Sequence, residues 1–193
     1  MIHWHQYEPT LVTDLYEITM AASYFHEGKR GEATFSMYIR DCPPVRGYFV
    51  AAGLESFLNI LENFRFSDDA IDYLRSLGRF SEDFLNYLKG FRFSGSVRAL
   101  PEGTIFFPYE PLIEVTAPII ESQILESLVM NIFHIETLIA SKAARCVEVA
   151  GGRGLVDFSL RRTHGVDAAV KVARSSYLVG FMGTSNLMAG KLY

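Results

Sequence analysis

The sequence is poor in cysteine, in positive charge and in long apolar runs. Its 193 residues include two cysteines, Cys42 and Cys146, and neither has a Cys or His partner at metal-ligand spacing, which argues against a disulfide framework or a zinc site. The 18 lysines and arginines are outnumbered by 22 aspartates and glutamates. Nucleic-acid and anionic-membrane binders need a basic face, so this balance argues against both partners.

Two further absences bear on where the protein acts. No segment approaches the roughly 18 consecutive apolar residues of a membrane span. The first residues have neither the basic stretch nor the apolar stretch of a secretion signal. Because the two cysteines also suit a reducing compartment, the sequence predicts a cytoplasmic protein with no membrane partner.

Apolar material is abundant: 49% of the residues are hydrophobic and 13% are aromatic, which is enough for one sizeable core or two small ones. A helix is predicted over residues 14–25, with Leu15 and Phe25 on its apolar face. Asp14 and Glu17 are spaced as a capping box at its start.

The next hundred residues predict alternating strand and helix layers. Residues 33–40 alternate strictly between apolar and polar, which predicts a strand with Arg40 on its polar face. Residues 94–118 have short apolar runs separated by Pro and Gly, a pattern that predicts short antiparallel strands joined by tight turns. Between these segments lie three predicted helices, each with a start signal: 53–64, 67–77 and 81–91.

A long apolar segment, 121–150, predicts one helix that ends at Gly151 and Gly152. A strand over 155–160 and a helix over 167–180 continue a βα rhythm, so the predicted fold class is α/β (or α+β). The composition shift near Pro118 marks the expected domain boundary. The predicted domains are 1–118 and 119–193.

Arg161 and Arg162 follow the predicted strand 155–160, and ligands of α/β proteins gather at the carboxyl ends of strands. Two guanidiniums there indicate an anion site, although they could instead pair with nearby acids such as Asp157. His134, within the long helix, fits a buried core histidine better than a ligand. The residues by themselves therefore indicate an α/β enzyme fragment that handles an anionic small molecule.

Four segments, in order along nearly the whole chain, resemble nicotinate phosphoribosyltransferases. They are LVTDLYEITM at 11–20, RGYFVAAGLE at 46–55, DFSLRRTHG at 157–165 and GTSNLMAGKL at 183–192. The resemblance implies an N-terminal sandwich-like α/β domain followed by the beginning of an irregular α/β barrel, which is incomplete in this chain. It also implies a homodimer with shared active sites. The family joins nicotinate to phosphoribosyl pyrophosphate, and ATP hydrolysis and Mg²⁺ assist the reaction that begins NAD salvage from nicotinate.

The resemblance assigns roles to individual residues. Phe158 is similar to the aromatic residue that stacks on the pyridine ring, and Tyr16 of a second subunit closes the stack from the other side. Arg161 is similar to the residue that binds the nicotinate carboxylate, which a planar guanidinium can hold through two hydrogen bonds. Ser185 stands where nicotinamide-specific relatives carry an aspartate, so it implies preference for the acid over the amide.

Three further positions match the family in a supporting role. Asp14 resembles an acid beside the ring, Arg40 a residue that helps hold the pyrophosphate, and His164 a residue of a substrate-side loop. The family's phosphorylated histidine would lie beyond Tyr193, so the resemblance implies no catalytic residue in this chain and no resident metal site. The 193 residues correspond to about half of the family's usual chain and are expected to be inactive alone.

Two alternatives to a nicotinate enzyme stay open from the sequence. A noncatalytic protein could keep the ring-binding pocket and the dimer surface without phosphoryl chemistry. A sister phosphoribosyltransferase could act on nicotinamide or quinolinate.

Overall fold

The computed structural model describes residues 7–42, 44 and 46–193. The N-terminal segment considered for a secretion signal therefore lies largely outside the described residues. A short 3₁₀ helix, η2 (Pro9–Leu11), precedes the first long element. The predicted N-terminal helix is confirmed as α1 (Leu15–His26).

The central sheet is antiparallel, and β5 is its middle strand. The strand order is β1-β5-β3, with Phe35 and Val97 both opposite Val115. The expected alternation is confirmed, although β1 ends before Arg40, which is exposed. The three strands are β1 (Glu32–Met37), β3 (Ser96–Ala99) and β5 (Ile113–Pro118).

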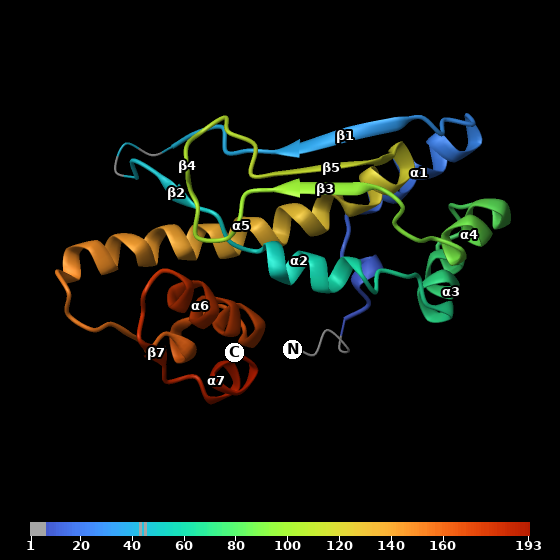
Figure 1. Cartoon of the computed structure of the whole chain (residues 1–193). Helices are drawn as coiled ribbons and strands as arrows, with labels where there is room; N and C mark the ends of the chain where they lie inside the picture. The colour runs from blue at the N-terminus through green and yellow to red at the C-terminus, as the bar shows by residue number, and fades with distance from the viewer. Residues whose placement is uncertain (1–6, 43, 45) are drawn as a thin grey trace.

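Helix α5 (Ile119–Ala150) is the axis of the molecule, and its 32 residues span about 48 Å at 1.5 Å per residue. Figure 1 shows the sheet along one side of α5, and α6 with α7 on the opposite side. Residues of α5 as far as Phe133 belong to the main hydrophobic core, which also contains the sheet and the first four helices. The helix ends at Gly151, whose φ of 58° is the left-handed conformation that glycine adopts readily.

Three short helices close the end of this core, as the sequence predicts. Ser67 and Ser81 cap two of them: their hydroxyls accept hydrogen bonds from Ala70 N at 3.1 Å and Phe84 N at 3.3 Å. The helices are α2 (Leu54–Leu61), α3 (Asp68–Ser76) and α4 (Glu82–Lys89). A small antiparallel pair, β2 (Phe49–Val50) with β4 (Ile105–Phe106), lies away from α3 and α4, and β2 contacts α5 (Figure 1).

The predicted capping box at α1 is wrong. Asp14 makes no side-chain cap, and its carboxylate instead accepts a hydrogen bond from Ser127 Oγ at 3.0 Å. Glu17 is fully buried and accepts from the amide of Gln123. Both partners lie on α5, so tertiary hydrogen bonds replaced the local ones that the spacing suggested.

The last forty residues form a parallel βαβ unit. The predicted strand 155–160 is shorter than expected, because Asp157 accepts hydrogen bonds from Ser159 N at 2.9 Å and Thr184 Oγ1 at 2.7 Å, and the chain then turns. Arg161 consequently lies on a 3₁₀ helix and not at the end of the strand. The elements are β6 (Val156–Asp157), η3 (Leu160–Arg162), α6 (Val166–Leu178), β7 (Gly183–Thr184) and α7 (Leu187–Leu192).

The expected α/β class is confirmed, and the described residues form no closed barrel. The expected domain boundary coincides with the junction of β5 and α5 and stays a prediction, since α5 contacts elements on both sides of it. By length and composition α5 could cross a membrane, contrary to what the sequence suggested. Within its most apolar window 56% of the helix is buried inside the protein, as in a core helix.

The βαβ unit predicts self-association of the isolated chain. Strands β6 and β7 pair only with each other among the described residues, which leaves strand edges open. Nearby apolar side chains are exposed, including Phe158 (70%) and Leu187 (90%). Ile132 of α5 is buried and contributes nothing to this exposed surface. Light scattering should therefore detect oligomers or aggregates. A compact monomer with a cooperative thermal transition would contradict this expectation.

Candidate functional site

The candidate residues lie in two separate regions, and the first is a cleft of about 740 Å³ where α1, α5 and α6 meet. The start of helix α1 places Asp14 and Tyr16 in its wall, and the substrate-binding roles that the resemblance implies for them stay predictions. Their neighbours in the wall carry both signs of charge. They include Glu17, Glu126, Ser127, His134, Asp167 and Lys171.

The end of the cleft near α1 is acidic. Gln123 donates from Nε2 to Glu126 Oε2 at 3.0 Å as well as to Glu17, which brings two carboxylates to one amide. Burial, then the charge of Glu17, raises the pKa of Glu126. A hydrogen bond to Glu17 and the charge of that carboxylate raise the pKa of Tyr16 to about 12, so the phenol stays protonated. Tyr16 is half exposed, as a ring that stacks on a ligand must be.

The other end of the cleft contains a buried lysine, Lys171, together with Asp167. Lys171 is only 6% exposed, and burial lowers its pKa while the charges of Glu136 and Asp167 oppose that shift. The prediction that His134 is a buried core residue is wrong, because it is exposed and lines the cleft. The sequence analysis missed Lys171. The signal for it was a lysine between apolar residues in the middle of a predicted helix.

The second region lies at the carboxyl ends of β6 and β7. Ser185 N donates to the carbonyl oxygen of Asp157 at 2.9 Å, which brings Ser185 next to the start of the Phe158 segment. Phe158 is 70% exposed. Arg161 and His164, on and just after η3, are exposed as well. This region therefore presents an aromatic ring, a hydroxyl and a guanidinium to solvent on one short loop system.

The structure does not unite the two regions in one chain. None of the strand-end candidates Phe158, Arg161 and Ser185 lines the cleft that contains Tyr16. Arg40 does not line the cleft either and is exposed in the segment after β1. The expected site shared between two copies of the chain, with Phe158 on one face of the ring and Tyr16 on the other, stays a prediction.

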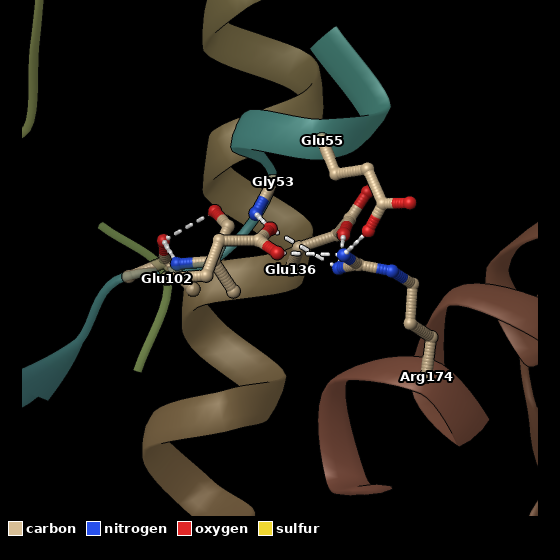
Figure 2. Close-up of polar contacts among 7 residues, drawn as sticks. Gly53, Glu55, Glu102, Glu136 and Arg174 are labelled. Carbon is tan, nitrogen blue, oxygen red and sulfur yellow. Dashed lines mark hydrogen bonds and ion pairs between the residues drawn. The ribbon is translucent and has the colours of Figure 1, made fainter. Parts of the chain in front are cut away.

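The strongest electrostatic cluster is one that the sequence analysis did not identify. Figure 2 shows the guanidinium of Arg174, on α6, pointing toward three carboxylates from other elements. It bonds Glu102 at 2.6 and 3.1 Å, Glu136 of α5 at 3.3 Å, and Glu55 of α2. Arg174 is 9% exposed and Glu136 is fully buried. The sequence signal was Glu136, a carboxylate in the middle of a long apolar helix.

Glu102 links this cluster to the backbone. Its Oε1 accepts from Gly53 N at 2.6 Å, where φ is 110° and an added Cβ would meet Ile132 Cγ2 at 3.3 Å. Burial by itself would raise the pKa of Glu102, but the hydrogen bond and charge of Arg174 outweigh burial and lower it. Burial raises the pKa of Glu136, the most enclosed of the three acids. The cluster thus joins α2, the turn before β4, α5 and α6.

Known proteins share this architecture and sequence. A family model for the nicotinate phosphoribosyltransferase N-terminal domain matches residues 11–134. The chain is 52% identical over 188 residues to the nicotinate phosphoribosyltransferase pncB2 of Mycobacterium tuberculosis, covering 97% of this chain and 41% of that protein. It is 42% identical over 185 residues to the Bacillus subtilis nicotinate phosphoribosyltransferase, and this match covers 95% of this chain and 38% of that protein.

Solved structures of related enzymes have the same fold as this chain. Human nicotinic acid phosphoribosyltransferase superposes with a TM-score of 0.86 at 36% identity, over 93% of this chain and 37% of that chain. The nicotinate-nucleotide pyrophosphorylase of Pyrococcus furiosus gives a TM-score of 0.77 over all of this chain and 42% of that chain, at 19% identity, a likeness that concerns the fold alone.

These matches define a class, the phosphoribosyltransferases of mixed α/β fold. Within that class, the chain belongs to the nicotinate phosphoribosyltransferase family, because the family model covers more than half of it. The resemblance recognised in the sequence is confirmed. The chain spans about two fifths of the length of the curated relatives named here.

Replacing Arg174 tests the importance of the ion cluster. Arg174→Met should lower the free energy of unfolding by about 3–5 kcal/mol, because it leaves buried carboxylates without their cation. Arg174→Lys should recover part of the loss, since it keeps the charge without the planar fork. Urea unfolding followed by circular dichroism measures both. Arg75→Gln, which breaks exposed ion pairs with Asp72 and Glu82, is the control and should change little.

Acid stability should report the lowered pKa of Glu102. A carboxyl whose pKa is lower in the folded than in the unfolded chain stabilises the fold above its unfolded pKa, about 4.3, and loses that effect as pH falls through the folded pKa. Glu102→Gln should therefore be less stable than the unmodified chain at pH 7, with the difference shrinking below about pH 4. Unfolding midpoints across pH measure this. The exposed substitution Glu27→Gln is the control, and equal pH profiles for all three chains would contradict the assignment.

Proposed function

We propose that this chain is the N-terminal part of an enzyme that transfers the phosphoribosyl group of phosphoribosyl pyrophosphate to the ring nitrogen of nicotinate. The products are nicotinate mononucleotide and pyrophosphate, and ATP hydrolysis assists the reaction. Membership of the nicotinate phosphoribosyltransferase family along nearly the whole chain carries this proposal. Such an enzyme serves NAD salvage, and its two free cysteines suit the cytoplasm.

The exposed residues at the ends of β6 and β7 suit the pyridine ring and its carboxylate. Phe158 offers a face for stacking, which contributes about 1–3 kcal/mol for aromatic bases. Arg161 would bind the carboxylate through two parallel hydrogen bonds. Tyr16 would close the stack from a second copy of the chain, while its hydroxyl proton is donated to Glu17. A homodimer is therefore part of the proposal.

The remaining assignments are supporting ones. Asp14 would lie beside the ring with Tyr16, since the two share the cleft wall. His164 would line the substrate loop with Arg161. Arg40 would help hold the departing pyrophosphate, which its exposure permits. The ring nitrogen is the nucleophile, so these side chains position the substrates and stabilise charge.

Mg²⁺ fits this chain poorly as a resident metal. The described residues hold no group of three or more His, Cys, Asp or Glu side chains arranged to bind a metal ion. Magnesium is commonly bound through substrate phosphates and water, so we assign it to the diphosphate of phosphoribosyl pyrophosphate. We assign no residue of this chain to ATP, because none matches the family's phosphohistidine segment.

The 193 residues by themselves are proposed to be inactive. Strands β6 and β7 have open edges, and Phe158 does not line the cleft that contains Tyr16. The proposed active site is therefore incomplete in this chain. A noncatalytic protein that binds the ring and a partner copy is the second candidate, because the exposed Phe158 and Arg161 could bind a ring without catalysing a reaction. Assaying the isolated chain against a version extended to the relatives' length separates the two, because only the first candidate gains activity.

In that extended enzyme, Arg161→Ala should weaken nicotinate use by about 2–5 kcal/mol, the range for removing one partner of a hydrogen-bonded charge pair. The affinity for phosphoribosyl pyrophosphate should change little. Steady-state kinetics with both substrates measures the effect. Arg79→Ala, at an exposed position in the turn after α3, is the matched control. An unchanged KM and kcat for nicotinate would remove Arg161 from the site.

Ser185→Asp tests the choice between acid and amide. A serine hydroxyl can donate a hydrogen bond to a substrate carboxylate, whereas an aspartate adds a like charge in a confined site. The variant should lose most of its kcat/KM for nicotinate, with any gain for nicotinamide smaller. Ser185→Thr, which keeps the hydroxyl, is the control. An unmodified enzyme that uses nicotinamide or quinolinate as well as nicotinate would point to the sister-enzyme alternative.

A further inference from the structure

The tetrapeptide Phe-Arg-Phe-Ser occurs twice in the chain, at 64–67 and at 91–94. The first copy follows α2 and the second follows α4. The structure brings them together through their aromatic rings, which pack edge to face. The ring centroids of Phe64 and Phe91 are 5.7 Å apart, and those of Phe66 and Phe91 are 5.9 Å apart. All three rings are nearly fully buried.

The packing of these rings leaves Arg65 and Arg92, the arginines of the two copies, next to the same surface pocket. In an extended segment successive side chains point to opposite faces, so burying Phe64 and Phe66 turns Arg65 outward, and burying Phe91 turns Arg92 outward. Arg65 and Arg92 indeed line one pocket of about 290 Å³. We name it the two-arginine pocket. Its other walls include Glu62, Leu58, Leu61 and Phe93.

The pocket has a positive charge that the described residues do not neutralise. Arginines elsewhere, such as Arg75 and Arg174, form ion pairs, whereas no ion pair in the described part of the chain includes Arg65 or Arg92. Arg92 instead donates to the carbonyl oxygen of Phe91, which holds its head group near the pocket. Glu62 is the one acid in the wall. Two guanidiniums against one carboxylate leave a net positive site on a chain of net charge −4.

We propose that the two-arginine pocket binds a small phosphate ester, with the phosphate between Arg65 and Arg92 and an apolar or aromatic group against Leu58, Leu61 and Phe93. Planar guanidiniums hold phosphate oxygens through paired hydrogen bonds. Pockets that bind small molecules have volumes of about 300–1,000 Å³. The two-arginine pocket is at the small end of this range, which suits a ligand with one ring and one phosphate. This site shares no residue with the cleft or with the strand ends of β6 and β7, so it is a second, noncatalytic site.

Binding of phenyl phosphate to the 193-residue chain tests the proposal. Equilibrium dialysis suits the experiment because it tolerates soluble oligomers. Each of Arg65→Gln and Arg92→Gln should weaken binding by about tenfold, the scale of one charge-assisted hydrogen bond. The single variants Arg79→Gln and Arg98→Gln, at exposed positions outside the pocket, each remove one charge as well and should bind as the unmodified chain does. Circular dichroism checks that every variant is folded.

The affinities for inorganic phosphate and for phenol measure the contributions of the two arginines and of the apolar wall separately. Phenyl phosphate should bind more tightly than either, and Phe93→Ala should reduce its advantage over inorganic phosphate. Any of three results would overturn the proposal. The first is no saturable binding up to about 10 mM, a very weak affinity. The second is an equal loss of affinity in the pocket variants and the control variants, and the third is inorganic phosphate binding as tightly as phenyl phosphate. The last result would leave an adventitious anion contact in place of a ligand site.

Discussion

The arrangement of the whole chain depends on one buried guanidinium. Arg174 is the common partner of Glu55, Glu102 and Glu136, which lie far apart in the sequence and belong to different elements. Glu102 and Glu136, with side chains 14% and 0% exposed, could not be packed together without a cation, because unpaired buried charges are strongly unfavourable, whereas Glu55 is 62% exposed. The fork of Arg174 therefore sets where α6 lies against α5, and α6 begins directly after the loop that contains Arg161 and His164.

The long helix α5 explains why the candidate site is split. One side of α5 supports the antiparallel sheet, and the opposite side supports α6 and α7 (Figure 1). Tyr16 enters the cleft from α1, whereas Phe158 and Ser185 lie at the strand ends of the βαβ unit. None of the strand-end candidates lines the cleft that contains Tyr16, although α6 contributes to its wall. A pyridine ring enclosed from both faces is thus most simply built by two copies of the chain, as we propose.

Local signals in the sequence predicted the elements well where local contacts stabilise them. Ser67 and Ser81 begin α3 and α4 through hydroxyl caps, and Gly151 ends α5, each as read from the sequence. The two predictions of local structure that were wrong, a capping box and a strand length, share one cause. The capping box of α1 and the full length of the strand after Leu155 were replaced by hydrogen bonds to distant residues, Ser127 on α5 and Thr184 on β7. Sequence spacing cannot weigh a local bond against a tertiary one.

The sequence by itself determined the α/β class, the order of the helices and strands, and membership of the family, because periodicity, caps and motifs are local properties of the chain. Only the tertiary structure decided which charges meet. It placed His134 at a cleft instead of in the core, gathered three carboxylates around Arg174, and turned Arg65 and Arg92 into one pocket. Electrostatic partners are chosen by distance in space and by burial, and neither quantity is written in the spacing of residues along the chain.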